Sequence, residues 1–146
     1  MQLIPIPLEG SPDLASVPIT ASVREWIDGN QAFYKVVSFA PPWTAYLAVE
    51  EDAVVGTCAF KGAPKPGIVE IAYATRPDLE GRGIATRMAM ELVRISRTTD
   101  PAVRIIAQTL PEVNASTRVL TKCGFAQVRD AVDDEAGTVW EWELPA

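Results

Sequence analysis

The sequence of 146 residues contains no histidine. Histidine is part of Ser-His-Asp and Cys-His nucleophile systems and of most zinc sites, so its absence excludes these kinds of active site. Only two cysteines occur, Cys58 and Cys123, and they are too far apart for a CxxC motif. This usage predicts two reduced, buried thiols in a reducing compartment. We expect no metal site and no disulfide.

Long apolar runs and excess positive charge are also missing. No stretch of about 18 apolar residues occurs, as a membrane span would need, and the first residues lack the features of a signal peptide. Lys and Arg number 13 against 19 Asp and Glu, which gives a formal net charge of −6. A basic stripe for nucleic acid is therefore not expected. We predict a cytoplasmic protein with no membrane or nucleic-acid partner that mildly attracts cations such as amines.

Apolar residues make up 48% of the chain and charged residues 22%, which is typical of a globular protein. The length suits one domain spanning residues 1–146. The residue patterns predict an extended segment at 3–6, one or two short helices within 20–38, strands at 45–50, 53–61 and 68–75, a helix at 82–97, a strand at 103–109, a helix at 112–122 and two C-terminal strands. This order indicates an α/β (α+β) domain with a mixed sheet.

The predicted strand 68–75 is nearly all apolar, which is typical of a strand covered on both faces. Glu70 is its only charged residue. A carboxylate at such a place is costly unless it has a partner. Two interpretations remain open, a catalytic base and a structural role in which Glu70 pairs with an arginine or caps a bulge.

Between this strand and the next helix lies a loop with two glycines, Gly81 and Gly83. The unpaired N–H groups of a helix N-terminus attract phosphate, and glycine lets an anion approach the backbone. A tight turn with no ligand explains the same residues equally well. The spacing fits neither a Walker A loop nor a dinucleotide fingerprint.

The loop resembles the phosphate loop of the GNAT acetyltransferase superfamily, (Gln/Arg)-x-x-Gly-x-(Gly/Ala), over residues 80–85, with Glu80 in place of Gln or Arg. Residues 70–73, Glu-Ile-Ala-Tyr, are similar to Glu-Ile-Gly-Tyr of the ribosomal-protein-alanine acetyltransferase branch. Residues 111–125 resemble that branch's Pro-Glu-Asn-x-Ala-Ser-x-x-Val-Leu-x-Lys-x-Gly-Phe, with Val113 at the position of the family asparagine. On these three motifs the chain is identified as a member of the superfamily.

The resemblance implies a mixed, mostly antiparallel sheet of about six to seven strands with about four helices, in which strands 68–75 and 103–109 splay apart. Acetyl-CoA would be the cosubstrate, with its pantetheine arm beside residues 71–75 as a pseudo-strand and its pyrophosphate on the amides of 81–86. We expect Glu80 to point to solvent. The predicted cofactor contacts are Ile71, Ala72, Tyr73, Ala74, Gly81, Arg82, Gly83, Ile84, Ala85, Thr86 and Asn114.

The predicted catalytic residues are Glu70 and Ser116. Glu70 would take the proton of the attacking amine, directly or through water, and a backbone N–H near Ala72 or Tyr73 would polarise the thioester. The tyrosine acid of many relatives falls on Leu120, which leaves Ser116 as the hydroxyl on that helix. A helix-capping serine explains Ser116 equally well. A covalent route through a cysteine lacks any group that activates the thiol.

These features together predict an acetyl-CoA-dependent N-acetyltransferase in which a small-molecule or peptide amine attacks the thioester directly, with a homodimer as a possible assembly. The missing family residues and Glu80 also suit a non-catalytic acyl-CoA-binding module. A generic nucleotide-binding α/β domain is a third interpretation. We expect residues 20–44 to recognise the acceptor. The aromatic residues of this region are Trp26, Phe33, Tyr34 and Trp43. We expect most of them to be core residues and one or two to line an acceptor pocket.

Overall fold

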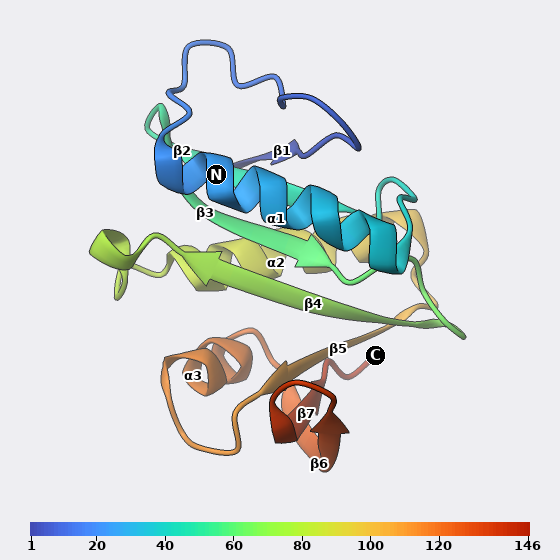
Figure 1. Cartoon of the computed structure of the whole chain (residues 1–146). Helices are drawn as coiled ribbons and strands as arrows, with labels where there is room; N and C mark the ends of the chain where they lie inside the picture. Colours follow the sequence, from blue (N-terminus) through green and yellow to red (C-terminus); the bar gives the residue numbers. More distant parts are fainter.

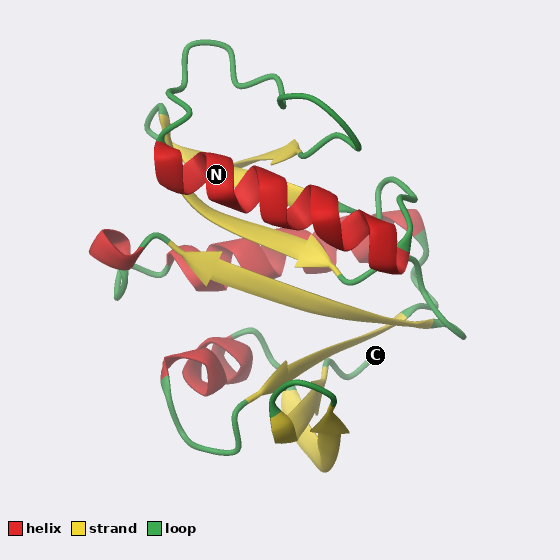
Figure 2. Ribbon diagram, viewed as in Figure 1, coloured by secondary structure: helices red, strands yellow, loops and turns green.

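A computed structural model describes residues 1–146 and contains one seven-stranded sheet with helices on both faces (Figures 1 and 2). The strands are β1 Gln2–Pro5, β2 Ala45–Glu50, β3 Ala53–Phe60, β4 Ile68–Thr75, β5 Arg104–Thr109, β6 Ala126–Asp133 and β7 Gly137–Glu143. The helices are α1 Ala21–Val37, α2 Ile84–Thr99 and α3 Ala115–Lys122, with a 3₁₀ turn η1 at Pro77–Leu79.

The strand order is β1-β2-β3-β4-β5-β7-β6. Every pairing is antiparallel except that of β4 with β5. This confirms the predicted mixed, mostly antiparallel sheet. The helix count differs slightly, since three α-helices and one 3₁₀ turn stand where about four helices were expected. None of the helices is long and apolar enough to cross a bilayer.

Residues 20–38 form one helix rather than two. Thr20 caps its N-terminus by accepting a hydrogen bond from the Val23 N–H at 3.3 Å. No proline interrupts the following residues, and Ser38, with φ at 73°, ends the helix. The face with Val23, Ile27 and Tyr34 is buried. In Figure 1 this helix lies over β2 and β3, on the side of the sheet away from α2.

Side chains of successive strand residues point to opposite faces of the sheet, so the sheet separates two apolar clusters. In β2, Ala45 and Leu47 pack in the cluster below α1, and Tyr46 and Ala48 pack in the cluster with α2. The second cluster is the larger, with 17 buried residues against 8. It contains Met88 and Leu92 of α2 together with Leu120 of α3, so it fixes both helices against the strands that carry the site.

The strands β4 and β5 separate along their length, as Figure 1 shows. They pair over three positions only, from Ile68 with Arg104 to Glu70 with Ile106. Beyond Glu70, β4 continues to pair with β3 on its other edge, through Ile71 opposite Phe60 to Thr75 opposite Gly56. The second half of β4 therefore has one paired edge and one open edge. This confirms the predicted splay.

Candidate active site

The glycine loop connects η1 to α2 and presents a row of free backbone amides. Gly81 and Gly83 adopt left-handed conformations, with φ at 79° and 77°, which residues with a side chain rarely adopt. The N–H groups of residues 81–86 donate to no group of the protein. With the positive end of the α2 dipole they form a site suited to phosphate. Glu80 is exposed, in agreement with the expectation.

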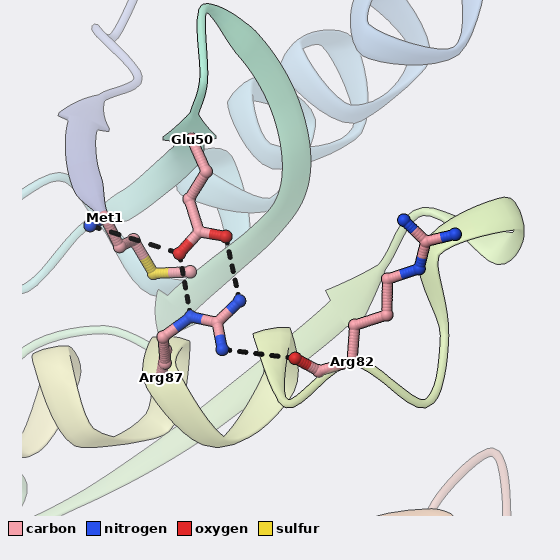
Figure 3. Close-up of polar contacts among 4 residues, drawn as sticks. All are labelled: Met1, Glu50, Arg82 and Arg87. Carbon is pink, nitrogen blue, oxygen red and sulfur yellow. Dashed lines mark hydrogen bonds and ion pairs between the residues drawn. The ribbon is translucent and has the colours of Figure 1, made fainter.

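An ion pair between Glu50 and Arg87 supports this loop (Figure 3). We call this pair, with its contact to the Arg82 carbonyl, the brace. The Arg87 guanidinium donates to both carboxylate oxygens of Glu50, at 2.7 and 2.8 Å, and to the carbonyl of Arg82 at 3.1 Å. The amino group of Met1 lies 4.0 Å from the same carboxylate. A Cβ on Gly83 would lie 3.1 Å from the Arg87 guanidinium, so a side chain there would be strained by its positive φ and would also crowd Arg87.

The brace was not predicted, because Glu50 and Arg87 are 37 residues apart in sequence and neither belongs to a motif. The hydrogen bonds from Arg87 hold the pKa of Glu50 below its usual value. Arg82 contributes its carbonyl to the brace, and Figure 3 shows its guanidinium directed away from the Glu50–Arg87 pair.

A cavity of about 410 Å³ lies between β4, the glycine loop and α3. This size suits a small-molecule or cofactor site. Its lining includes Tyr73, Thr75, Leu79, Glu80, Gly81, Gly83, Ile84, Ala85, Thr86, Ala115, Ser116, Arg118, Val119 and Lys122. Most of the predicted loop contacts are therefore brought together. Arg118 and Lys122 add positive charge on the α3 side, and neither residue was predicted from the sequence.

The open edge of β4 faces the same cavity. The Glu70 carbonyl accepts from the Lys61 N–H, and the Arg76 N–H donates to the Val55 carbonyl, so even-numbered residues turn their backbone groups toward β3. Because these groups alternate along a strand, Tyr73 turns its own groups toward the gap. Ala72 and Ala74 face β3 instead. Of the two predicted oxyanion donors, the N–H of Tyr73 is the one on the open side.

A smaller cavity of about 100 Å³ lies where β4 and β5 separate. It is lined by Lys61, Glu70, Ile71, Ala72, Tyr73, Ala107, Gln108 and Ser116, and it shares Tyr73 and Ser116 with the larger cavity. The Glu70 carboxylate does have a partner, as expected, but the partner is a lysine. Its Oε2 lies 2.7 Å from the Lys61 Nζ. Lys61 was not predicted as a site residue.

The hydroxyl groups of Tyr73 and Ser116 are 3.1 Å apart at the junction of the two cavities. Burial raises the pKa of Tyr73 above its usual value, and the hydrogen bond with Ser116 offsets only part of this. Ser116 does not cap α3, so that interpretation is wrong. The hydroxyl of Tyr73 was missed because a tyrosine in a buried strand is more often a core residue.

Asn114 is the residue that caps α3. Its Oδ1 accepts from the Thr117 N–H at 3.1 Å, and the Thr117 hydroxyl accepts from the Asn114 N–H at 2.9 Å. Asn114 does not line the larger cavity, so its contact with a cofactor stays a prediction. Val113 is 77% exposed. Leu120 is fully buried in the core, and no hydroxyl replaces it there.

Neither cysteine is activated. Burial, with the charge of Glu91 nearby, raises the pKa of Cys58 to about 12. Burial also raises the pKa of Cys123. Both thiols are free and both stay protonated at neutral pH, which disfavours a covalent acetyl-cysteine. The structure contains no cluster of three or more His, Cys, Asp or Glu side chains able to hold a metal ion.

The aromatic residues of the 20–44 region line neither cavity. Tyr34 is buried, and its hydroxyl donates to the Ile6 carbonyl and accepts from the Ala45 N–H. Trp43 packs edge-on against Phe60, with ring centroids 5.1 Å apart. These two residues serve the core, as most of this group was expected to do.

Comparison with known families identifies the architecture. The model of the acetyltransferase (GNAT) domain family matches residues 11–126, which includes β4, the glycine loop and α3. The chain belongs to the GNAT acetyltransferase family. The family predicted from the three sequence motifs is thereby confirmed. A comparison with curated proteins gives no match.

Several solved GNAT structures share the fold. A spermidine N-acetyltransferase SpeG chimera from Vibrio cholerae and hSSAT has a TM-score of 0.69 at 13% identity. The match covers 99% of this chain and 95% of the chimera. A microcin self-immunity acetyltransferase in complex with acetyl-CoA and AMP has a TM-score of 0.65 at 15% identity, covering 86% and 71%. The ribosomal-protein acetyltransferase RimL in complex with coenzyme A has a TM-score of 0.64 at 17% identity, covering 84% and 70%.

Proposed function

We propose that this GNAT protein transfers the acetyl group of acetyl-CoA to a primary amine by direct attack of the amine on the thioester. The observation that carries the proposal is a continuous path across the sheet. It leads from the free amides at the start of α2, along the open edge of β4, to Glu70 at the point where β4 and β5 separate.

Each part of acetyl-CoA has a complementary surface along this path. The amides of residues 81–86 would receive the pyrophosphate, and Arg118 and Lys122 supply positive charge on the opposite wall. The pantetheine amides would pair with the free carbonyl of Tyr73 and the free backbone groups of Thr75 on the open edge of β4. The thioester would then lie at the junction of the two cavities, beside Tyr73 and Ser116.

The chemistry requires an amine without its extra proton, because an alkylammonium, with a pKa of about 10, has no lone pair. Glu70 would accept that proton as the C–N bond forms, directly or through a water molecule. The N–H of Tyr73 would stabilise the oxyanion. The tetrahedral intermediate then collapses with cleavage of the C–S bond.

The acceptor belongs to the broad class of small-molecule or peptide amines. The similar structures carry the names of acetyltransferases of spermidine and of a ribosomal protein, so their range supports the broad class rather than one amine. The negative net charge of the chain favours cationic acceptors. Two free thiols are consistent with work in the cytoplasm. A homodimer remains part of the proposal.

Two measurements test this function. Acetyl-CoA should raise the melting temperature of the protein and ATP should not. A screen of polyamines, aminoglycosides, amino acids and peptide N-termini should then find at least one amine that causes release of free coenzyme A thiol. Stabilisation by acetyl-CoA without release for any amine would instead support the non-catalytic acyl-CoA-binding module, which the exposed Val113 and the buried Leu120 favour. Absence of any stabilisation by acetyl-CoA would contradict both.

A further inference from the structure

Lys61 is the one primary amine that lines the cavity where β4 and β5 separate. The chain has four lysines, and of the other three, Lys35 and Lys65 line neither cavity, while Lys122 lies at the phosphate end of the larger one. The Lys61 side chain is 37% exposed. The side chain is therefore half-buried, with part of its surface against the protein and part in contact with solvent.

The sheet fixes Lys61 beside the proposed base. Its N–H donates to the Glu70 carbonyl at 2.8 Å, which extends the β3–β4 ladder by one residue. Its Nζ lies 2.7 Å from Glu70 Oε2. The ammonium thus already makes the contact that an incoming acceptor amine needs in order to lose its proton.

The charge of Lys61 also acts on Asp133, at the β6–β7 turn. The pKa of Asp133 lies below its usual range, because the N–H groups of Ala136 and Glu135 donate to its carboxylate and because the positive charge of Lys61 is nearby. The positive charge of Lys61 therefore acts on two carboxylates, that of Glu70 through a direct ion pair and that of Asp133 through a longer-range attraction.

We propose that Lys61 is itself an acetyl acceptor, modified within its own chain when acetyl-CoA occupies the groove. The inference rests on the proposed function, which puts the thioester in the cavity that Lys61 lines. A tethered amine beside a base needs no encounter with a second molecule, and such proximity corresponds to effective molarities of about 10⁵–10⁸ M in model reactions.

The step balances without any further reactant. Glu70 takes one proton from the Lys61 ammonium, and the neutral Nζ attacks the carbonyl carbon of the thioester. A C–N bond forms, the C–S bond breaks, and the thiolate of coenzyme A takes up a proton. The products are Nε-acetyl-Lys61, coenzyme A and one proton released to solvent.

The modification would occur once and then stop. An amide nitrogen carries no positive charge, so acetylation removes the cation that acts on Glu70 and Asp133 and ends the ion pair with Glu70. The acceptor side of the cavity becomes more negative by one charge, and Glu70 is left free to meet an external amine.

The test uses the intact protein with acetyl-CoA and no added amine, followed by mass spectrometry of peptides from a protease that does not cut at lysine. We expect one acetyl group per chain, at Lys61, with a rate that saturates in acetyl-CoA and a rate constant independent of protein concentration. Lys61 should react about 10²-fold faster than Lys35 and Lys65. Heat-unfolded protein should lose this preference.

Three variants sharpen the result. Lys61→Arg keeps a cation beside Glu70 and should abolish the acetylated peptide. Lys65→Arg, a matched change in the adjoining loop, should leave Lys61 acetylation unchanged. Glu70→Gln should slow it by about 10²-fold, as loss of a general base does.

Labelling of Lys61 at the rate of Lys35 and Lys65, or at an undiminished rate in Glu70→Gln, would overturn the inference. If the amine panel is acetylated while Lys61 stays unmodified, the inference is wrong and the proposed function stands. If acetyl-CoA fails to stabilise the protein, the proposed function itself is wrong.

Discussion

Glu70 and Lys61 form an ion pair that is only partly shielded from water, with side chains 19% and 37% exposed. Pairs of this kind contribute little to stability, typically 0–1 kcal/mol, so an incoming amine can replace Lys61 at small cost. The same carboxylate is thus available for catalysis. A carboxylate that served only as a structural partner would not exchange its lysine so easily. At the scale of single residues, this difference favours Glu70 as the proposed base.

Replacing Glu70 by Gln should lower kcat by about 10²–10⁴-fold with little change in the Kd for acetyl-CoA, because the base acts only on the amine. The deficit should shrink as the pH approaches the amine pKa of about 10, where the acceptor loses its proton unaided. Steady-state rates between pH 7 and the alkaline range measure this. Glu91→Gln, at a surface pair with Arg94, is the control. An equal deficit at every pH would remove Glu70 from proton transfer.

Removing the hydroxyl of Tyr73 should have a smaller effect. A thiol, with a pKa of about 8.5, is a stronger acid than tyrosine, so the departing thiolate gains a hydrogen bond rather than a full proton. Such a bond is worth about 1 kcal/mol, and Tyr73→Phe and Ser116→Ala should each lower kcat several-fold. Because the two hydroxyls contact each other, the double variant should lose less than the product of the single effects. A loss as large as that of Glu70→Gln would make one of them an essential acid.

Glu70 could be predicted from sequence because its signal is local, one charge in an apolar strand. Lys61 could not be predicted, because its place depends on the β3–β4 register across the loop at 62–67. Ser116 was predicted as a hydroxyl on the right helix, but its partner Tyr73 is 43 residues away. Contacts between distant segments follow from the fold and have no pattern of their own in the chain.

At the scale of elements, we expect the turn into α2 to decide the affinity for acetyl-CoA. Gly81→Ala places a methyl group where the protein itself has nothing within 4 Å, so any crowding must come from the ligand. The Kd for acetyl-CoA should rise by about tenfold, or 1.4 kcal/mol, as measured by calorimetry.

Gly10→Ala is the matched control for Gly81→Ala. Gly10 also has a left-handed conformation, with φ at 80°, and open space at its Cβ. Both variants should lose about 1 kcal/mol of unfolding free energy from backbone strain, and only Gly81→Ala should lose affinity. An unchanged Kd in Gly81→Ala would show that the loop is only a turn.

The brace behind the loop gives a second prediction at this scale. Arg87→Lys keeps the charge but loses the two-fold contact with Glu50 and the contact with the Arg82 carbonyl, so acetyl-CoA should bind several-fold more weakly. Arg94→Lys, further along α2, should have no effect. Since Arg87 lowers the pKa of Glu50, the contribution of this pair to stability is present above the ordinary pKa of 4.5 and is lost as the pH falls. Equal affinity of both variants would contradict the role of the brace.

The type and order of the elements could largely be predicted, and their ends less so. The helix expected at 82–97 begins at Ile84, because Gly83 is its left-handed N-cap. The helix expected at 112–122 begins at Ala115, because Asn114 and Thr117 form a capping box there. In both cases a backbone conformation outside the apolar pattern sets the boundary.

At the scale of the whole molecule, β4 and β5 separate, and each of these two strands is held by different neighbouring elements. β3 pairs with one edge of β4 and α2 packs on it, and β7 pairs with the far edge of β5. The apolar pattern of 68–75 predicts a buried strand but does not reveal that one edge is open. The splay was predicted through family resemblance alone.

Amide hydrogen exchange, resolved by residue with NMR in the presence and absence of saturating coenzyme A, tests this arrangement most directly. We expect slower exchange at Tyr73, at Thr75 and along residues 81–86, whose N–H groups lack partners in the protein, and no change in α1. If coenzyme A stabilises the protein while exchange at all of these amides stays the same, the cofactor does not lie along the open edge of β4 and the account is wrong.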